Sequence, residues 1–343
     1  MRSTVGSLAM MFGFAACASA PEGPAPPKLP EPEPTVATAA TAAPSVAPTV
    51  DPADTPPPSP CPDGMVFVDT VHCPDTATTK VGLTCKKSSR KNPNHLNICY
   101  AFEGEQTCSV PKRRQQYCID RYEYPNEKGG HPPVMVNAYD AAGLCAEQGK
   151  RMCFESEWSA ACEGPDKLPF PYGHTRSKEH CNIDNRFIHP STEKVHSYDE
   201  RVRTPELLKL DQSVPSGSME TCKSGFGVYD LTGNFDEWVM TEWERGKSKW
   251  AGLKGGAWGH VRNACRPITT SHVSHWSYYF ITFRCCADPR ASALEGLPAP
   301  EGSEGVPIWT HPDATAPPHP AGRPMDRGWT PPEGVEGPNR PKR

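Results

Sequence analysis

Three carboxylates lie close together in the segment GFGVYDLTGNFDEWV, residues 225–239: Asp230, Asp236 and Glu237. Gly227 precedes the first carboxylate, Gly233 lies between the first and the second, and Trp238 follows Glu237 directly. Carboxylates and turn carbonyls at this spacing suit a hard cation such as Ca²⁺, which takes six to eight oxygen ligands. A tight turn that leads into a buried tryptophan would use the same residues. From this segment alone both interpretations stay open.

The cysteines indicate an oxidising compartment. The chain has 15 cysteines, and all except Cys17 fall between Cys61 and Cys286. No CxxC pair occurs, which argues against a structural zinc site. A dense, even set of 14 behind an apolar leader predicts up to seven disulfides in an exported protein.

The N-terminus, MRSTVGSLAMMFGFAACASA, has one basic residue followed by a short apolar run. Such a run suits a signal peptide and is too short for a permanent membrane span. FAAC resembles the bacterial lipobox, so we expect residues 1–17 to be a signal peptide and Cys17 to be lipidated. Phe14 stands where leucine is usual, and cleavage after the ASA at residues 18–20 is the alternative.

Composition divides the rest of the chain. Of the 41 prolines, 14 fall in residues 21–60 and 13 from Pro289 onward. Such segments bury too little apolar surface to offset the entropy of ordering. We therefore predict a disordered linker at 18–60, one folded domain at 61–288 and a disordered tail at 289–343. The net charge of -4, with no basic stripe, gives no indication of nucleic-acid binding.

Within the domain, the pattern predicts an α+β fold with many loops. Short strands are expected at 65–68 and 117–126, on either side of a cysteine-rich insertion at 73–117 with little regular structure. Asn137 is a suitable cap for a helix that ends near Gln148, and a second helix is predicted at 155–162. Residues 169–225 are expected to be mostly loop.

Several motifs in fixed order resemble the formylglycine-generating enzyme, or sulfatase-modifying factor, family. They extend over about 220 residues. This resemblance implies a C-type-lectin-like α+β core with few helices, a small antiparallel sheet and bound Ca²⁺. The matching segments are GMVFV near 65, IDRYE at 119–123, AYDAAGLCAEQGKRM at 138–152, ESEWSAACEG at 155–164, FPYG at 170, CNID at 181, GVYDLTGNFDEW at 227, LKGGAW at 253 and TFRC at 282–285.

The resemblance also implies particular site residues. One structural calcium ion would be held through four positions, and a second would begin at an Asn-Ile pair. A family disulfide would join Cys145 to Cys285. Cys162 also stands at a disulfide position, but its usual partner is missing, which leaves Cys153, Cys265 and Cys286 as candidates. The implied calcium ligands are Asp230, Gly233, Phe235 and Glu237 for the first ion, and Asn182 with Ile183 for the second.

The family's chemistry places the catalytic question further along the chain. Formylglycine formation needs two thiolates that bind Cu(I), since soft ligands select this ion. The matching positions here are His260 and Cys265, so an imidazole replaces one thiolate and the standard mechanism should fail. An altered copper site at this pair is one alternative. An iron centre made of His260, His272 and His275 is another, and a disulfide at Cys265 with non-ligating histidines is the third.

These observations predict an exported, membrane-anchored lipoprotein facing the periplasm or the cell surface. Its single domain would bind or scaffold a peptide, protein or glycan ligand, with an iron or copper oxidoreductase as the alternative function. Active formylglycine generation on sulfatases is the third possibility. The aromatic side chains that could line a ligand cleft are Trp250, Trp258, Trp276, Tyr278 and Tyr279.

Overall fold

The computed structural model describes residues 59–74, 82–89, 98–259, 263–311, 316–320 and 322–341. The predicted signal peptide, Cys17 and nearly all of the predicted linker lie outside these residues. Across the described residues, no helix has the length and apolar character needed to span a membrane.

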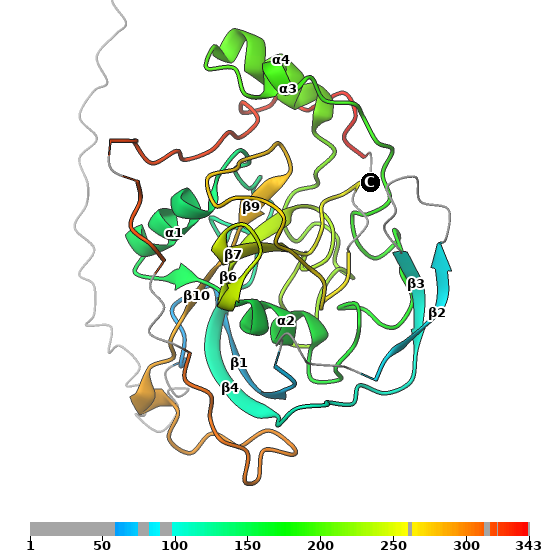
Figure 1. Ribbon diagram of the computed structural model, residues 1–343, viewed down its shortest axis with the longest axis vertical. Coiled ribbons are helices and arrows are strands. Elements are labelled where there is room, and N and C mark those ends of the chain that lie inside the picture. The colour runs from blue at the N-terminus through cyan, green and yellow to red at the C-terminus, as the bar shows by residue number, and fades with distance from the viewer. Residues whose placement is uncertain are drawn as a thin grey trace, which may run out of the picture. The chain divides into compact units, whose positions relative to one another are not determined.

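The first sheet joins the beginning and the end of the domain (Figure 1). Its four strands are antiparallel and run in the order β1-β4-β10-β5, with Val68 of β1 opposite Tyr117 of β4. Both of these side chains are buried, so the sheet contributes one face to the core. The strands are β1 (Met65–His72), β4 (Arg113–Asp120), β5 (Arg151–Met152) and β10 (Cys285–Ala287).

A second four-stranded sheet carries the acidic segment. The order is β8-β7-β6-β9, and β6 pairs parallel with β9 while the other pairs are antiparallel. Trp238 and Phe283 face each other across the parallel pair and are buried in the main core. The strands are β6 (Asp236–Arg245), β7 (Lys249–Lys254), β8 (Ile268–Thr269) and β9 (Ile281–Phe283).

The two predicted helices are present as α1 (Ala138–Glu147) and α2 (Glu155–Glu163). The Asn137 side chain accepts hydrogen bonds from two backbone N–H groups at the start of α1, as the sequence predicts. Phe154 precedes α2 and offers no side-chain cap. Glu157 accepts a hydrogen bond from the Phe154 backbone N–H at 2.8 Å, so part of the cap is supplied from within the helix.

Two regions contain more regular structure than we predicted. The cysteine-rich insertion forms a hairpin of β2 (Thr84–Ser89) and β3 (Ile98–Glu103). The expected loop at 169–225 contains α3 (Thr192–Val195) and α4 (Glu200–Leu210). The sequence did not reveal these elements because both have a low apolar content. The hairpin is held by a disulfide between Cys85 and Cys99, and α4 buries only Glu206, Leu207 and Leu210.

The proline-rich tail differs from the disordered segment that its composition predicted. It begins with the short 3₁₀ helix η2 (Ala291–Ala293) and follows the outside of the domain to α4 (Figure 1, orange to red). Ile308 forms a parallel bridge with Arg114 of β4, and Trp329 exchanges backbone hydrogen bonds with Val134. Trp329 is buried in the main core cluster. A few aromatic anchors therefore compensate for the lack of regular structure.

All 14 cysteines after Cys17 are paired. Cys145 is bonded to Cys285, the pair that the resemblance implied, and Cys162 is bonded to Cys265, one of its three candidate partners. Seven disulfides are typical of a protein that folds outside the reducing cytosol. The remaining pairs are Cys61–Cys118, Cys73–Cys108, Cys85–Cys99, Cys153–Cys286 and Cys181–Cys222.

Candidate functional site

Cys265, the predicted catalytic residue, lies in a disulfide. Its sulfur is 2.08 Å from that of Cys162 on α2, and both side chains are fully buried. The bond contributes to a core cluster that also includes Trp158 and Val228. A sulfur in a disulfide is not a thiolate, so it can neither bind Cu(I) as the copper hypothesis requires nor act as a nucleophile. The structure contradicts the catalytic prediction for Cys265 and agrees with the third alternative, a disulfide at this cysteine.

The histidines give no support for a metal centre. His260 lies outside the described residues, so the roles predicted for it stay predictions. The His272 ring stacks on Trp276 with 3.7 Å between ring centroids, and His275 is exposed at the surface. Within the part of the chain that the structure describes, no group of three or more His, Cys, Asp or Glu side chains is placed to hold a metal ion.

The acidic segment contains a buried ion pair. Glu237 on β6 and Arg284 after β9 are both buried, and the carboxylate accepts two hydrogen bonds of 2.7 Å from the guanidinium. Trp158 of α2 donates a third hydrogen bond to Glu237 at 2.8 Å. The pair therefore connects the second sheet to α2. Charge-assisted, two-pronged bonds of this kind fix geometry strongly.

Two further carboxylates surround this pair. Asp230 accepts a hydrogen bond from the Gly217 backbone N–H at 2.7 Å, and Glu123 accepts one from Asn234 at 2.9 Å. Burial raises the pKa of Asp230 well above its usual value, and the negative charge of Glu123 is the second cause of this rise. Burial also raises the pKa of Glu123 to about 7. The cluster thus holds three carboxylates against one guanidinium, and protonation relieves part of the imbalance.

The loop between Asp230 and Glu237 packs tightly on the other predicted calcium segment. The backbone oxygen of Asn182 accepts a hydrogen bond from Asn234 N–H at 2.9 Å. Gly233 has a φ of +83°, and a Cβ there would lie 2.5 Å from that same oxygen, so only glycine fits. Ile183 is buried against the loop. The structure therefore brings the two predicted segments together.

This geometry does not fit the complete calcium set. Both Glu237 oxygens are already bonded to Arg284 and Trp158, so the guanidinium takes the position of a cation at this carboxylate. The Asn182 side-chain oxygen accepts from Asn185 at 2.8 Å, and its amide group donates to Gln212 and Asn234. Calcium binding through Asp230 and the carbonyls of Gly233 and Phe235 stays a prediction.

Sequence reasoning missed Glu123 and Arg284 as members of this site. Both stand inside motifs that were used only to establish the resemblance, IDRYE and TFRC. A signal was available for Arg284, because a charged residue among the apolar residues of ITFRCC needs a partner of opposite charge when the segment is buried. No local pattern, however, pairs residues that are 114 or 47 positions away from Glu237.

The family assignment follows from comparison with known proteins. The model of the sulfatase-modifying factor enzyme 1-like domain matches residues 88–289, more than half of the chain. The chain belongs to the formylglycine-generating enzyme family. The family assignment and the mixed α+β, loop-rich architecture agree with the resemblance in the sequence.

Individual relatives in the family are distant. An "Inactive C-alpha-formylglycine-generating enzyme 2" of Bos taurus is 28% identical over 134 residues, 38% of this chain and 40% of the relative. The "Serine/threonine-protein kinase pkn1" of Chlamydia caviae is 30% identical over 109 residues, 32% of this chain and 13% of that kinase. The chain thus matches less than half the length of these two relatives. PvdO from Pseudomonas aeruginosa aligns with 68% of this chain and 99% of its own, at 16% identity and a TM-score of 0.38.

Proposed function

We propose that this chain is an exported member of the formylglycine-generating enzyme family that lacks formylglycine-generating activity and serves as a binding or scaffold protein of the cell envelope. The disulfide between Cys162 and Cys265 carries the proposal. His260 stands at one of the family's two thiolate positions, and the disulfide removes the remaining thiolate, that of Cys265. A relative whose name includes "Inactive" supports the loss of activity.

The location in the envelope rests on two features. Seven disulfides indicate that the domain matures in an oxidising compartment. The apolar leader and Cys17 would supply the lipid anchor, and residues 18–60 would separate the domain from the membrane. Mass spectrometry of the mature protein tests the anchor, which requires an N-terminal, acylated Cys17.

A polar cleft is the candidate ligand surface. It has a volume of about 640 Å³ and lies between the loop that carries His275, the region of α3 and α4, and the tail. Tyr198, which is fully exposed, stands at this cleft beside His196 and Arg203. Arg323 of the tail forms part of the opposite wall. Guanidinium, imidazole and aromatic groups together suit a ligand rich in hydroxyl or acid groups, such as a glycan or a polar peptide.

The predicted aromatic cleft is thereby divided into two parts. Trp258 and Tyr279 are buried in the core, and Trp250 packs against it beside Tyr139. Trp276 and Tyr278 are half-buried and stacked with 5.1 Å between ring centroids, next to the residues that line the polar cleft. They stabilise this wall rather than form a separate site.

An activity assay tests the proposal directly. The full chain is loaded with Cu(I) and incubated in air with a cysteine-containing sulfatase peptide, beside an active family member as the positive control. We expect the peptide thiol to remain unchanged in mass spectra. Conversion to the aldehyde, reproduced by the wild type and abolished by Cys265→Ala, would overturn the proposal.

A further inference from the structure

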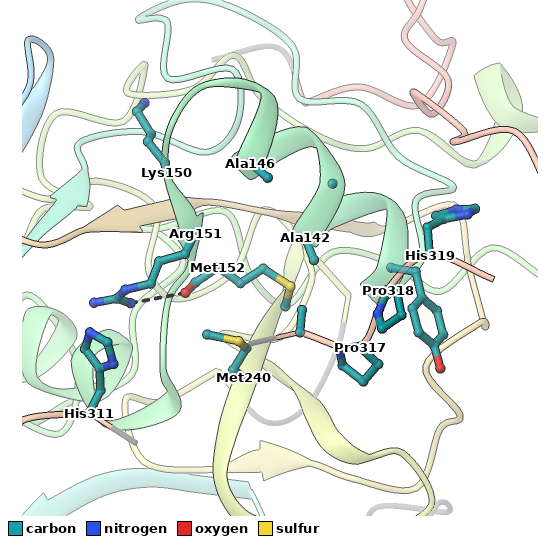
Figure 2. A pocket seen from close by; sticks show the side chains of 13 residues that line it. Ala142, Ala146, Lys150, Arg151, Met152, Met240, His311, Pro317, Pro318 and His319 are labelled. Atoms are coloured by element: carbon teal, nitrogen blue, oxygen red, sulfur yellow. Dashed lines mark hydrogen bonds between the residues drawn. The ribbon is translucent and has the colours of Figure 1, made fainter. Parts of the chain in front are cut away.

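A second cavity lies beside α1 at the edge of the main core, and the core residues Met152 and Met240 form part of its lining. It has a volume of about 470 Å³ and is separate from the acidic cluster and from Cys265. Its walls come from α1, β5, β6 and the proline-rich tail (Figure 2). Such a volume is within the range of small-molecule sites, about 300–1,000 Å³.

One face of α1 leaves this space open. Tyr139, Ala142, Gly143 and Ala146 recur at helical spacing and line the cavity, so three of the four have little or no side chain. The opposite face of α1 packs Ala141, Leu144 and Cys145 into the core. An amphipathic surface helix would instead present polar side chains to solvent on that face. The helix thus has a second apolar face, which borders the cavity and of which Ala142 also packs against the edge of the main core.

Methionines and prolines form the other walls. Figure 2 shows the side chains of Met152 and Met240 reaching into the space between α1 and the tail. Pro317 and Pro318 lie across from them on the tail. Methionine is flexible and polarisable, so it adapts to ligands of different shape. The lining therefore favours an apolar guest without demanding one fixed outline.

The charged groups at the ends of the cavity are already neutralised. Arg151 donates to Glu157 at 2.8 Å and to Asp288 at 2.9 Å, and His311 lies 3.1 Å from the same Asp288. At the other end, His319 lies 2.9 Å from Asp140. Since each of these groups has a carboxylate partner within the protein, a charged ligand gains little by entering.

The tail fixes the roof of the cavity. Met325 packs on Gly143 so closely that a Cβ on this glycine would lie 2.5 Å from the methionine sulfur. Asp140 holds the roof through both His319 and the backbone N–H of Asp326, at 2.9 and 3.0 Å. A proline-rich roof anchored on both sides loses little entropy when a ligand binds beneath it.

We propose that this cavity binds an uncharged apolar group, an acyl chain or an aromatic ring, between α1 and the tail. This site adjoins the polar cleft, with which it shares His319, and it does not rest on the proposed loss of activity. Its occupant is selected by the apolar lining, whereas the paired charges at both ends set the length that fits.

The test uses the full chain and N-phenyl-1-naphthylamine, an uncharged fluorescent probe. We expect saturable binding at one site, with competition by decanol if a chain fits and by naphthalene if a ring fits. Ala142→Leu fills the cavity and should weaken probe binding at least tenfold. Ala291→Leu makes the same exchange at an exposed position on η2 and should leave binding unchanged.

Two controls keep the result interpretable. Ala142→Met is a milder filling that a helix tolerates, so it should weaken the probe less than leucine does while the melting curve stays that of the wild type. Met240→Ala enlarges the cavity and should retain binding. Probe binding that does not saturate, or that is equal in wild type and in a folded Ala142→Leu variant, would overturn the proposal.

Discussion

The acidic cluster and the cysteine pair contact the same face of α2, through Trp158 and Cys162, and they differ in the chemistry that holds them. At the cluster, Glu237 still pairs with Arg284 and receives a bond from Trp158 of α2. One helical turn further along, Cys162 is bonded to Cys265, the position at which the resemblance implied a catalytic thiolate. The comparison teaches that one face of α2 carries both a buried charge network and a disulfide, so the sulfur of Cys265 occupies a structural position in the core.

The largest expected effect comes from breaking the buried ion pair. Glu237→Ala leaves Arg284 without its partner in a buried site, and we expect a loss of about 3–5 kcal/mol in the free energy of unfolding. Urea denaturation measures it. Lys86→Ala removes a cation from an exposed pair with Glu103 and should cost less than about 1 kcal/mol. Equal losses in the two variants would contradict a structural role for the buried pair.

Removing the Cys162–Cys265 bond should also destabilise the domain. The bond closes a long loop, with a sequence separation of 103, and the double variant Cys162→Ala/Cys265→Ala should lose about 2–5 kcal/mol. The matched control is Cys85→Ala/Cys99→Ala in the hairpin, which has a separation of 14 and should lose less. If urea denaturation showed no loss of unfolding free energy in Cys162→Ala/Cys265→Ala, the sulfur of Cys265 would have no structural role.

The acidic cluster should make stability depend on pH. Folding raises the pKa of Glu123 from its ordinary 4.5 to about 7, so the folded protein holds a proton that the unfolded chain has released. The stabilisation that Glu123 contributes to the folded state is therefore fully present below pH 4.5. It declines as the pH rises to about 7, and the loss in unfolding free energy is on the order of 3 kcal/mol.

Glu123→Gln should remove this decline, because the amide does not titrate. The measurement is the difference in unfolding free energy between variant and wild type at pH 5 and at pH 8. Relative to the wild type, the variant should have a higher unfolding free energy at pH 8 than at pH 5. Glu244→Gln, an exchange at an exposed carboxylate, is the control. A constant difference across this range would argue against a protonated carboxyl in the cluster.

The smallest expected effect lies at the start of α1, where Asn137 also lines the polar cleft. Asn137 caps this helix through two N–H groups, and Asn137→Ala should cost about 1 kcal/mol. A shift of the thermal midpoint by a few degrees would report it. The effect should leave probe binding in the apolar cavity unchanged, since Asn137 does not line that cavity.

Local patterns predicted α1 and α2 well, missed α3 and α4, and indicated few of the long-range contacts. Asn137 and the alanine spacing after it specify α1 within the chain itself, as do the charged residues and Trp158 for α2. The tail was misjudged because a proline-rich composition conceals a few decisive anchors: Trp329 and its partner Val134 are 195 positions apart. The partner of Cys162 was equally open, since three cysteines competed for it and sequence alone does not determine disulfide connectivity.

The state of Cys265 tests the central claim most directly. The purified protein is alkylated with iodoacetamide under native conditions without reductant, then unfolded, digested and analysed by mass spectrometry. We predict a disulfide-linked peptide that joins Cys162 to Cys265, with no alkylation at either residue. An alkylated Cys265 in the folded protein would show a free thiol and contradict the account.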